Sequence, residues 1–306
     1  MKYISIANTD LQVSNIIMGN MRLPQLSTAE AENLIRSAME EGINFFDHAD
    51  IYGKGRSEEL FSEAIQMTPA VREKMILQSK CGIRNGYFDF SKEHILESVD
   101  GILKRLNTEY MDILLLHRPD PLMEPAEVAE AFDELHKSGK VRYFGVSNHN
   151  PAQIELLQKY TPHKLVVNQL QFSIAHTPMI DAGITLNMKT DQAINRDMSV
   201  LEYCRLNDIT IQAWSPYQHG FFGGSFLGDL EHYPKLNEVV DGIAEKYGVT
   251  NTAIATAWIT RHPANIQVVL GTTKVERLKD ACLGSDIRLT REEWYQIYKA
   301  AGNIIP

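Results

Sequence analysis

Short apolar runs and helical stripes of apolar residues alternate along most of the chain. The runs are typical of buried strands and lie at 16–18, 44–46, 75–79, 112–116, 143–146, 165–168, 209–213 and 266–270. Apolar positions three and four residues apart predict helices at about 27–42, 57–65, 95–106, 128–135, 151–160, 200–205, 236–247, 252–261, 275–283 and 290–298. Ser27 with Glu30 and Thr290 with Glu293 fit capping boxes that begin two of these helices. Residues 3–13 alternate like a short hairpin with its turn at 8–10.

The order of these elements predicts the fold class. Eight strands, each followed by helix, imply a parallel sheet, and this chain length fits a closed (β/α)8 TIM barrel of the α/β class. An open doubly wound sheet is the alternative. It normally has a glycine-rich turn after its first strand, whereas residues 19–22 contain one glycine. No linker-like segment divides the chain. We therefore predict a single domain over 1–306, with the N-terminal hairpin at about 3–13.

Composition narrows the classes of partner. A net charge of −9 argues against nucleic acid, although a local basic patch for a small anionic cofactor remains compatible with it. No apolar stretch approaches the ~20 residues of a membrane span, and the N-terminus lacks the apolar core of a signal peptide. Cys81, Cys204 and Cys282 are far apart and fit reduced thiols. We expect a cytoplasmic protein that acts on a small molecule; the oligomeric state is not predicted.

Candidate chemistry lies where three apolar runs end. Asp47, Lys80 and His117 close successive runs, and Tyr52 follows Asp47 by five positions. The C-terminal ends of parallel strands converge, so these side chains are expected to meet. An ammonium lowers the pKa of a nearby phenol, and a carboxylate holds that ammonium in a buried site. Such a phenol is an acid suited to complete a hydride transfer to a carbonyl, with His117 orienting the substrate oxygen. Taken singly, each residue also has an ordinary structural role: a cap, a solvated lysine, a backbone partner or a packed ring.

The motif Asp47-x4-Tyr52-Gly53, with Lys80 and His117, resembles the catalytic tetrad of the aldo-keto reductases. The likeness extends to residues 145–148, 168–169, 213–216 and 271–277, and is greatest to bacterial members related to the potassium-channel β-subunit branch. The resemblance implies a (β/α)8 barrel that reduces an aldehyde or ketone to an alcohol by hydride transfer from NADPH. Tyr52 would donate the proton, supported by Lys80 and Asp47, and His117 would orient the carbonyl.

The same resemblance implies an NADP(H) site. The carboxamide of the nicotinamide would be held by Ser147, Asn148 and Gln169, and its ring would stack on Trp214. The pyrophosphate would lie against Ser215, Tyr217 and the following loop, and the 2′-phosphate against Thr272, Thr273, Lys274 and Arg277. The other implied cofactor contacts are Asn20, Met21, Asp47, Pro216, Gly271 and Asp280. The family often has Tyr or Phe where Trp214 stands, and Glu-Asn where Asp280-Ala281 stands. Lys274 and Arg277 begin a predicted helix, whose dipole also favours an anion.

Two other classes of function fit parts of the pattern. A metal-dependent barrel hydrolase needs a cluster of ligands, and the chain shows scattered ones; His48 and Asp50 are interpreted as packing or polar support, and no metal site is expected. A nicotinamide-binding module that senses redox state with little turnover would retain the same tetrad. The natural substrate is not predicted, and the candidates for its pocket wall are Met21, Tyr87, His149, Trp214 and Phe222.

Overall fold

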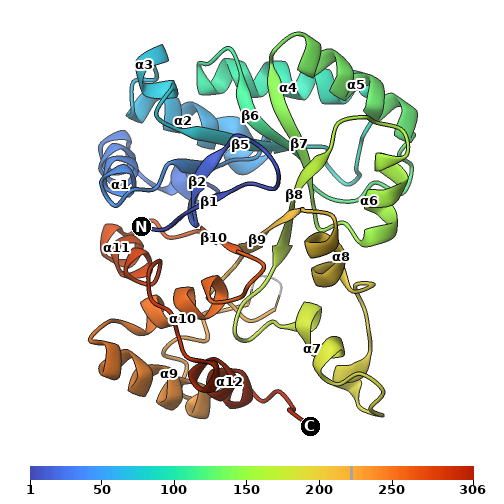
Figure 1. The fold of residues 1–306 in the computed structure, drawn as a ribbon. Helices are drawn as coiled ribbons and strands as arrows, with labels where there is room; N and C mark the ends of the chain where they lie inside the picture. The colour runs from blue at the N-terminus through green and yellow to red at the C-terminus, as the bar shows by residue number, and fades with distance from the viewer. Residues whose placement is uncertain (221–222) are drawn as a thin grey trace.

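The computed structural model describes residues 1–220 and 223–306, and a closed barrel of parallel strands forms its centre. The order around the barrel is β10-β3-β4-β5-β6-β7-β8-β9. These strands are β3 (Ile16–Gly19), β4 (Phe45–Asp47), β5 (Ile76–Cys81), β6 (Met111–Leu116), β7 (Val141–Ser147), β8 (Leu165–Gln171), β9 (Thr210–Trp214) and β10 (Gln267–Leu270). Figure 1 shows the helices arranged around this barrel. The prediction of a single-domain (β/α)8 barrel is confirmed.

The helices begin and end within a few residues of the predicted bounds. They are α1 (Thr28–Glu40), α2 (Arg56–Ala64), α3 (Pro69–Arg72), α4 (Lys92–Leu106), α5 (Pro125–Lys137), α6 (Pro151–Gln158), α7 (Pro178–Ile184), α8 (Val200–Leu206), α9 (Pro234–Tyr247), α10 (Asn251–Thr260), α11 (Val275–Leu283) and α12 (Arg291–Ala300), with 3-10 turns η1 (Leu23–Gln25), η2 (Tyr52–Gly55) and η3 (Asp191–Ala193). Both capping boxes form, at the starts of α1 and α12. The short helices α3 and α7 were not predicted, because neither is long enough to repeat an apolar stripe.

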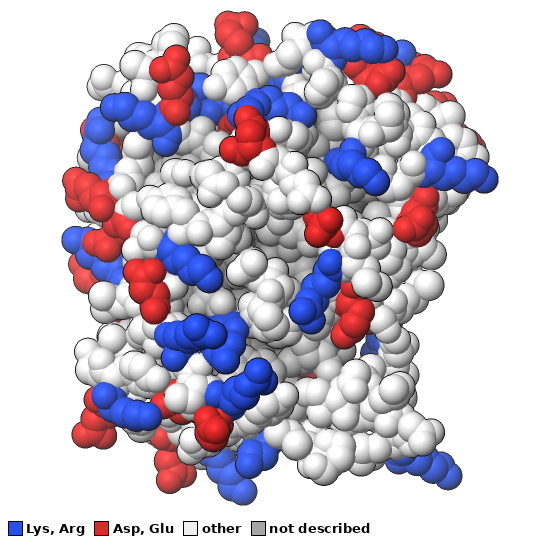
Figure 2. Space-filling model, in the orientation of Figure 1, with Lys and Arg blue, Asp and Glu red and all other residues white. Residues whose placement is uncertain are grey.

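The N-terminal hairpin covers one end of the barrel, as Figure 1 shows in blue at the centre of the view. Its strands, β1 (Tyr3–Ser5) and β2 (Gln12–Ser14), pair with Ile4 opposite Val13. The buried side chains of the hairpin pack in one cluster with apolar residues of the barrel interior, among them Ile17, Phe45 and Ile113. Burying this apolar surface holds the hairpin in place. On the face in Figure 2, acidic and basic side chains are interspersed and the centre carries few charges.

On β4, strand alternation turns one apolar and one polar side chain into the barrel interior. Phe45 packs in the cluster beneath the hairpin, and Asp47, two residues further along β4, points into the same interior. Asp47 lies opposite Gln78 in the parallel register, and Lys80 follows on the same face of β5. Polar side chains therefore gather at the C-terminal end, where the loops that connect strands to helices open. In the described parts of the chain, no helix has both the length and the apolar character needed to cross a membrane.

Candidate active site

A tight turn after β4 brings Tyr52 back over the barrel. Tyr52 begins η2, and its N–H donates to the Ala49 carbonyl at 3.0 Å. Gly53 has a φ of +58°, and a Cβ there would lie 2.7 Å from Cγ of Pro24. A side chain at this position is excluded both by the left-handed backbone and by the close approach of Pro24. Glycine at position 53 is therefore a requirement of this turn.

The ammonium of Lys80 joins the turn to the barrel. It is fully buried, and its Nζ donates to Oδ2 of Asp47 at 2.6 Å, to the His48 carbonyl at 2.7 Å and to the Tyr52 hydroxyl at 3.3 Å. An ammonium has three protons, so these three acceptors satisfy it. Desolvation alone would lower the pKa of Lys80, but Asp47 and Tyr52 outweigh it and the pKa is raised. The lysine stays charged beside the phenol.

The carboxylate of Asp47 is held from its other side by two amides. Its Oδ1 accepts from Nε2 of Gln78 at 2.6 Å and from Nε2 of Gln169 at 3.1 Å. Gln78 was not among the predicted site residues. The signal for it was present, since Gln78 precedes Lys80 by two positions and must share its face of the strand.

Tyr52 and His117 stand edge to face, with ring centroids 5.9 Å apart. Burial, followed by the charges of Lys80 and Arg118, lowers the pKa of His117 well below 6.5, so its imidazole is neutral at neutral pH. Desolvation raises the pKa of Tyr52 above 10.0, against the opposing effect of Lys80. The sequence-based expectation that Lys80 would lower this pKa was incomplete, because desolvation is the larger effect. The phenol is therefore protonated at neutral pH.

Buried His48 and half-buried Asp50 lie beside the tetrad in the sequence. His48 contacts the amide nitrogen of Asn20 through Nε2 at 3.2 Å and packs edge to face on Phe61. Burial, followed by the charge of Glu58, raises the pKa of Asp50 to about 7. Glu58 itself is buried and accepts from Arg105 at 2.7 Å. Within residues 1–220 and 223–306, no group of three or more His, Cys, Asp or Glu side chains could hold a metal ion.

The residues expected around a nicotinamide lie in mutual contact at the ends of β7, β8 and β9. Nδ2 of Asn148 donates to Oγ of Ser147 at 2.7 Å, and Nε1 of Trp214 donates to Oδ1 of Asn148 at 3.1 Å. Oγ of Ser147 donates to the Gln169 carbonyl at 3.0 Å. Asn148 has a φ of +60°, a conformation that asparagine tolerates better than most residues. These contacts hold Asn148 between Ser147 and Trp214.

The loop after β9 begins with a similarly constrained backbone. Ser215 has a φ of +51°, and its hydroxyl donates to Gln218 at 2.7 Å. Pro216 is buried, and the Tyr217 hydroxyl is 2.6 Å from that of Thr256 on α10. Tyr217 is thus bound to the helical layer, and both Tyr217 and Ser215 are half-buried. Phe222, one of the pocket candidates, lies outside the described residues.

The expected 2′-phosphate residues surround the start of α11. Lys274 is its N-cap residue with no side-chain cap, and Arg277 lies in its first turn; both are exposed. Thr272 and Thr273 are half-buried before it, and Gly271 is exposed. Nη1 of Arg22 donates to the Gly271 carbonyl at 3.2 Å, which brings a third cation that was not predicted.

Three further expected cofactor contacts differ in accessibility. Asn20 is buried, and its backbone N–H donates to the Asp47 carbonyl at 2.9 Å. Met21, the next residue, is 42% exposed. Asp280 is half-buried on α11. Of the three, Met21 has the surface most open to a ligand.

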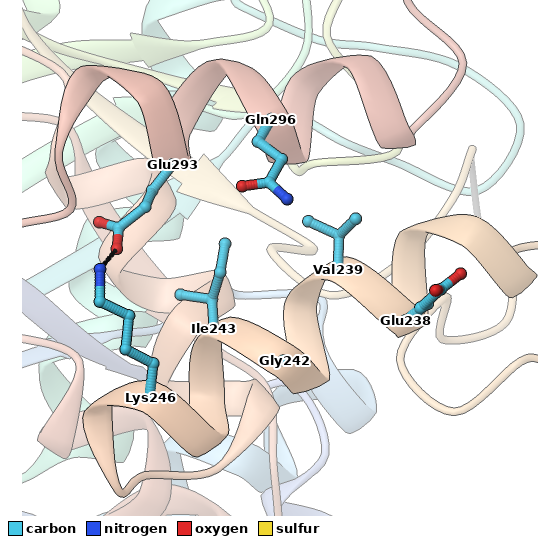
Figure 3. Close-up of a pocket in the computed structure, with 7 residues that line it drawn as sticks. All are labelled: Glu238, Val239, Gly242, Ile243, Lys246, Glu293 and Gln296. Carbon is cyan, nitrogen blue, oxygen red and sulfur yellow. Dashed lines mark hydrogen bonds and ion pairs between the residues drawn. The ribbon is translucent and has the colours of Figure 1, made fainter.

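Two cavities differ in whether expected cofactor residues line them. One of about 450 Å³ lies beside Trp214 and is also lined by Asn148, His149 and Arg118. His149 and Trp214 line this cavity, whereas Met21 and Tyr87 do not. The other, of about 330 Å³, is a groove between α9 and α12, lined by Glu238, Val239, Gly242, Ile243, Lys246, Glu293 and Gln296 (Figure 3). Among the described residues, none of Asp47, Tyr52, Lys80 and His117 lines either cavity, and only the first cavity is lined by expected cofactor residues, Asn148 and Trp214.

Comparison with known proteins shows the family and the fold of the chain. Residues 15–301 match the aldo/keto reductase family. The uncharacterised oxidoreductase YcsN of Bacillus subtilis is 37% identical over 98% of both chains, and a 6-dehydroglucose reductase of Agrobacterium fabrum is 33% identical over 95% of both. The solved structure of the thermostable aldo-keto reductase Tm1743 with the inhibitor epalrestat has a TM-score of 0.77 at 24% identity, covering 98% of this chain and all of its own, and shares the fold.

Lys80→Met tests the buried ion pair. The substitution keeps most of the side-chain stem but removes the charge, so Asp47 loses its ionic partner. We expect the free energy of unfolding to fall by about 3–5 kcal/mol in denaturant titrations, the usual cost of breaking a buried pair. Lys92→Met is the matched control, because Lys92 pairs with Glu130 at the surface and such pairs contribute about 1 kcal/mol or less. Equal losses in the two variants would contradict a buried pair at Asp47.

Asp50→Asn tests the raised pKa near the site. Between pH 3.8 and about 7, folded Asp50 keeps a proton that the unfolded chain has lost, so this group's contribution to stability falls as pH rises. The Asn variant cannot ionise. Its stability relative to wild type should therefore increase with pH, by up to about 1.4 kcal/mol per unit across that window. Asp100→Asn, at an exposed surface pair with Lys140, is the control. A difference that does not change between pH 4 and 8 would contradict the raised pKa.

Proposed function

The chain belongs to the aldo/keto reductase family, and we propose that it reduces an aldehyde or ketone to an alcohol with NADPH as the hydride donor. One observation carries the proposal. The buried ammonium of Lys80 donates to the Asp47 carboxylate and to the Tyr52 hydroxyl, and the His117 ring stands edge to face with the Tyr52 ring. This arrangement suits the transfer of one proton to a substrate oxygen.

In this proposal each side chain has one task. Tyr52 is the proton donor, and its raised pKa keeps the phenol protonated at neutral pH. Neutral His117 donates one hydrogen bond to the substrate oxygen and orients the carbonyl. As negative charge develops on that oxygen, Lys80 stabilises the phenolate that Tyr52 becomes. Asp47 keeps the ammonium in place, because a buried ammonium needs a partner of opposite charge.

The proposed NADP(H) site fits the donors and acceptors present. When bound, the cofactor supplies the hydride. The Gln169 amide nitrogen already donates twice within the barrel, which leaves its Oε1 for a carboxamide N–H. At the other end, Lys274 and Arg277 meet the N-terminus of α11 without an intramolecular cap, a usual setting for a phosphate. Arg22 adds positive charge near that segment.

The names of two relatives suggest one class of carbonyl to include in the substrate panel. Two relatives, 33% and 32% identical, are named 6-dehydroglucose reductases, so sugar aldehydes belong beside aromatic and aliphatic ones in a first screen. Multiple turnovers of any carbonyl with NADPH would support an enzyme. Tight binding of NADPH without turnover would instead favour the redox-sensing role.

Tyr52→Phe tests the proton donor. The substitution removes the hydroxyl alone, so NADPH affinity should stay near wild type while the carbonyl reduction rate falls by roughly 10²–10⁴-fold, the usual contribution of general acid catalysis. The measurements are fluorescence titration and steady-state kinetics, with the exposed Tyr160→Phe as control. A variant that retains more than about a tenth of the rate would exclude Tyr52 as the donor.

Arg277→Ala tests the preference for NADPH. An arginine–phosphate hydrogen bond contributes roughly 1.5–3 kcal/mol to binding. A free-energy difference of about 1.4 kcal/mol corresponds to a tenfold change in affinity. NADPH affinity should therefore fall by at least about tenfold while NADH affinity stays nearly unchanged. Lys279→Ala removes the same charge from the same helix and controls for its general electrostatic effect. If the wild type binds both cofactors equally, or if the Arg277 variant loses NADH as badly, the 2′-phosphate assignment is wrong.

A further inference from the structure

Four buried glutamines cross the interior of the barrel, where bulky branched apolar side chains are usual. They come from four strands, β5, β8, β9 and β10, and are Gln78, Gln169, Gln212 and Gln267. We propose that these glutamines form one hydrogen-bonded relay that orients the Asp47 carboxylate, and that they are positioning residues for the reaction. The inference rests on the proposed function for its kinetic consequence, but not for its geometry.

The upper part of the relay joins Asp47 to Gln212 through two amide groups. Nε2 of Gln78 lies 2.6 Å from Oδ1 of Asp47 and 2.8 Å from Oε1 of Gln212. Nε2 of Gln169 lies 3.1 Å from each of the same two oxygens. Each amide nitrogen carries two protons, and both protons of Gln78 and of Gln169 donate to these two oxygens. One carboxylate oxygen and one amide oxygen are thereby held by two parallel donors.

The lower part of the relay determines which way every amide faces. Nε2 of Gln212 donates to Oε1 of Gln267 at 3.1 Å, and Nε2 of Gln267 donates to the Ser14 carbonyl at 2.8 Å. A backbone carbonyl can only accept, so Gln267 must present its nitrogen to Ser14 and its oxygen to Gln212. Gln212 must then present its nitrogen downward and its oxygen upward. Reversing any one amide would leave two donors or two acceptors facing each other.

The relay leaves one acceptor unused. Oε1 of Gln78 is buried and has no hydrogen-bond partner among the described residues. A buried unpaired acceptor costs stability, so glutamines that merely filled space would be better replaced by apolar side chains. The cost is understandable if the nitrogen of Gln78 is required at Asp47. The acceptor at the lower end belongs to Ser14 of the hairpin, so the hairpin takes part in orienting the site.

The kinetic test uses Gln212→Met and Gln267→Met, neither of which touches Asp47. Weakening the relay should loosen the Asp47–Lys80 pair. Lys80 would then have a smaller effect on the pKa of the Tyr52 phenol. Reduction of 4-nitrobenzaldehyde with NADPH should slow by roughly two- to tenfold, the worth of one ordinary hydrogen bond. Because Lys80 lowers the pKa of Tyr52, the basic limb of the pH–rate profile should move to higher pH, by up to about one unit. NADPH affinity should change by less than about twofold.

The control is Val269→Ala, which empties space two residues further along the same face of β10. It should lower thermal stability without moving the basic limb. If the glutamine variants slow the reaction without moving that limb, as a packing defect would, the relay does not act on the site. If the wild type reduces no carbonyl, the proposed function is wrong. The hydrogen bonds of the relay are then tested by the neutron structure described next.

A neutron crystal structure of the wild type tests the relay without any variant having to fold, because it distinguishes amide nitrogen from oxygen. All four nitrogens should face as described, each donating to the stated oxygen. One reversed amide among Gln78, Gln169, Gln212 and Gln267 would overturn the inference.

Discussion

The buried ion pair between Asp47 and Lys80 is the interaction on which the candidate site depends. Its two charged atoms are 2.6 Å apart, and both side chains are almost fully withdrawn from water. Burying two charges is costly unless further hydrogen bonds satisfy the remaining lone pairs and protons. Here Lys80 has three acceptors and Asp47 has three donors, two of them amides that the barrel provides. The amides of Gln78 and Gln169 meet that requirement at Asp47.

The same low-polarity surroundings set the protonation of the other two tetrad residues. Burial raises the pKa of Tyr52 and lowers that of His117, so both are uncharged at neutral pH. An uncharged phenol and an uncharged imidazole each have a proton to donate to one oxygen. In the proposed reaction, the charged pair would stabilise the phenolate left after proton transfer. The acid would then be a different group from the charges that support it.

Much of this site could be predicted because it depends on local patterns. Asp47, Lys80 and His117 each follow an apolar run, and parallel strands bring such ends together. The spacing of Tyr52 from Asp47 placed the phenol on the loop after the strand. Gln169 was among the predicted site residues, and the spacing of Gln78 from Lys80 indicated its face of the strand. Gln212 and Gln267 were missed because a buried polar residue inside an apolar run gives no local sign of its partner. Arg22 was missed for a related reason: it reaches Gly271, which is 249 positions away along the chain.

The sequence by itself determined the fold class, the order of strands and helices, and the chemical kinds of group at each strand end, because hydrophobic periodicity and turn residues act over short distances. Tertiary structure decided which of those groups touch. Closure of the barrel places Gln267 of its last strand against Ser14 of the hairpin, and Gln169 against Asp47. Tertiary structure also decided that the pKa of Tyr52 is raised and not lowered. Desolvation depends on everything packed around the phenol and not on its neighbours in the chain.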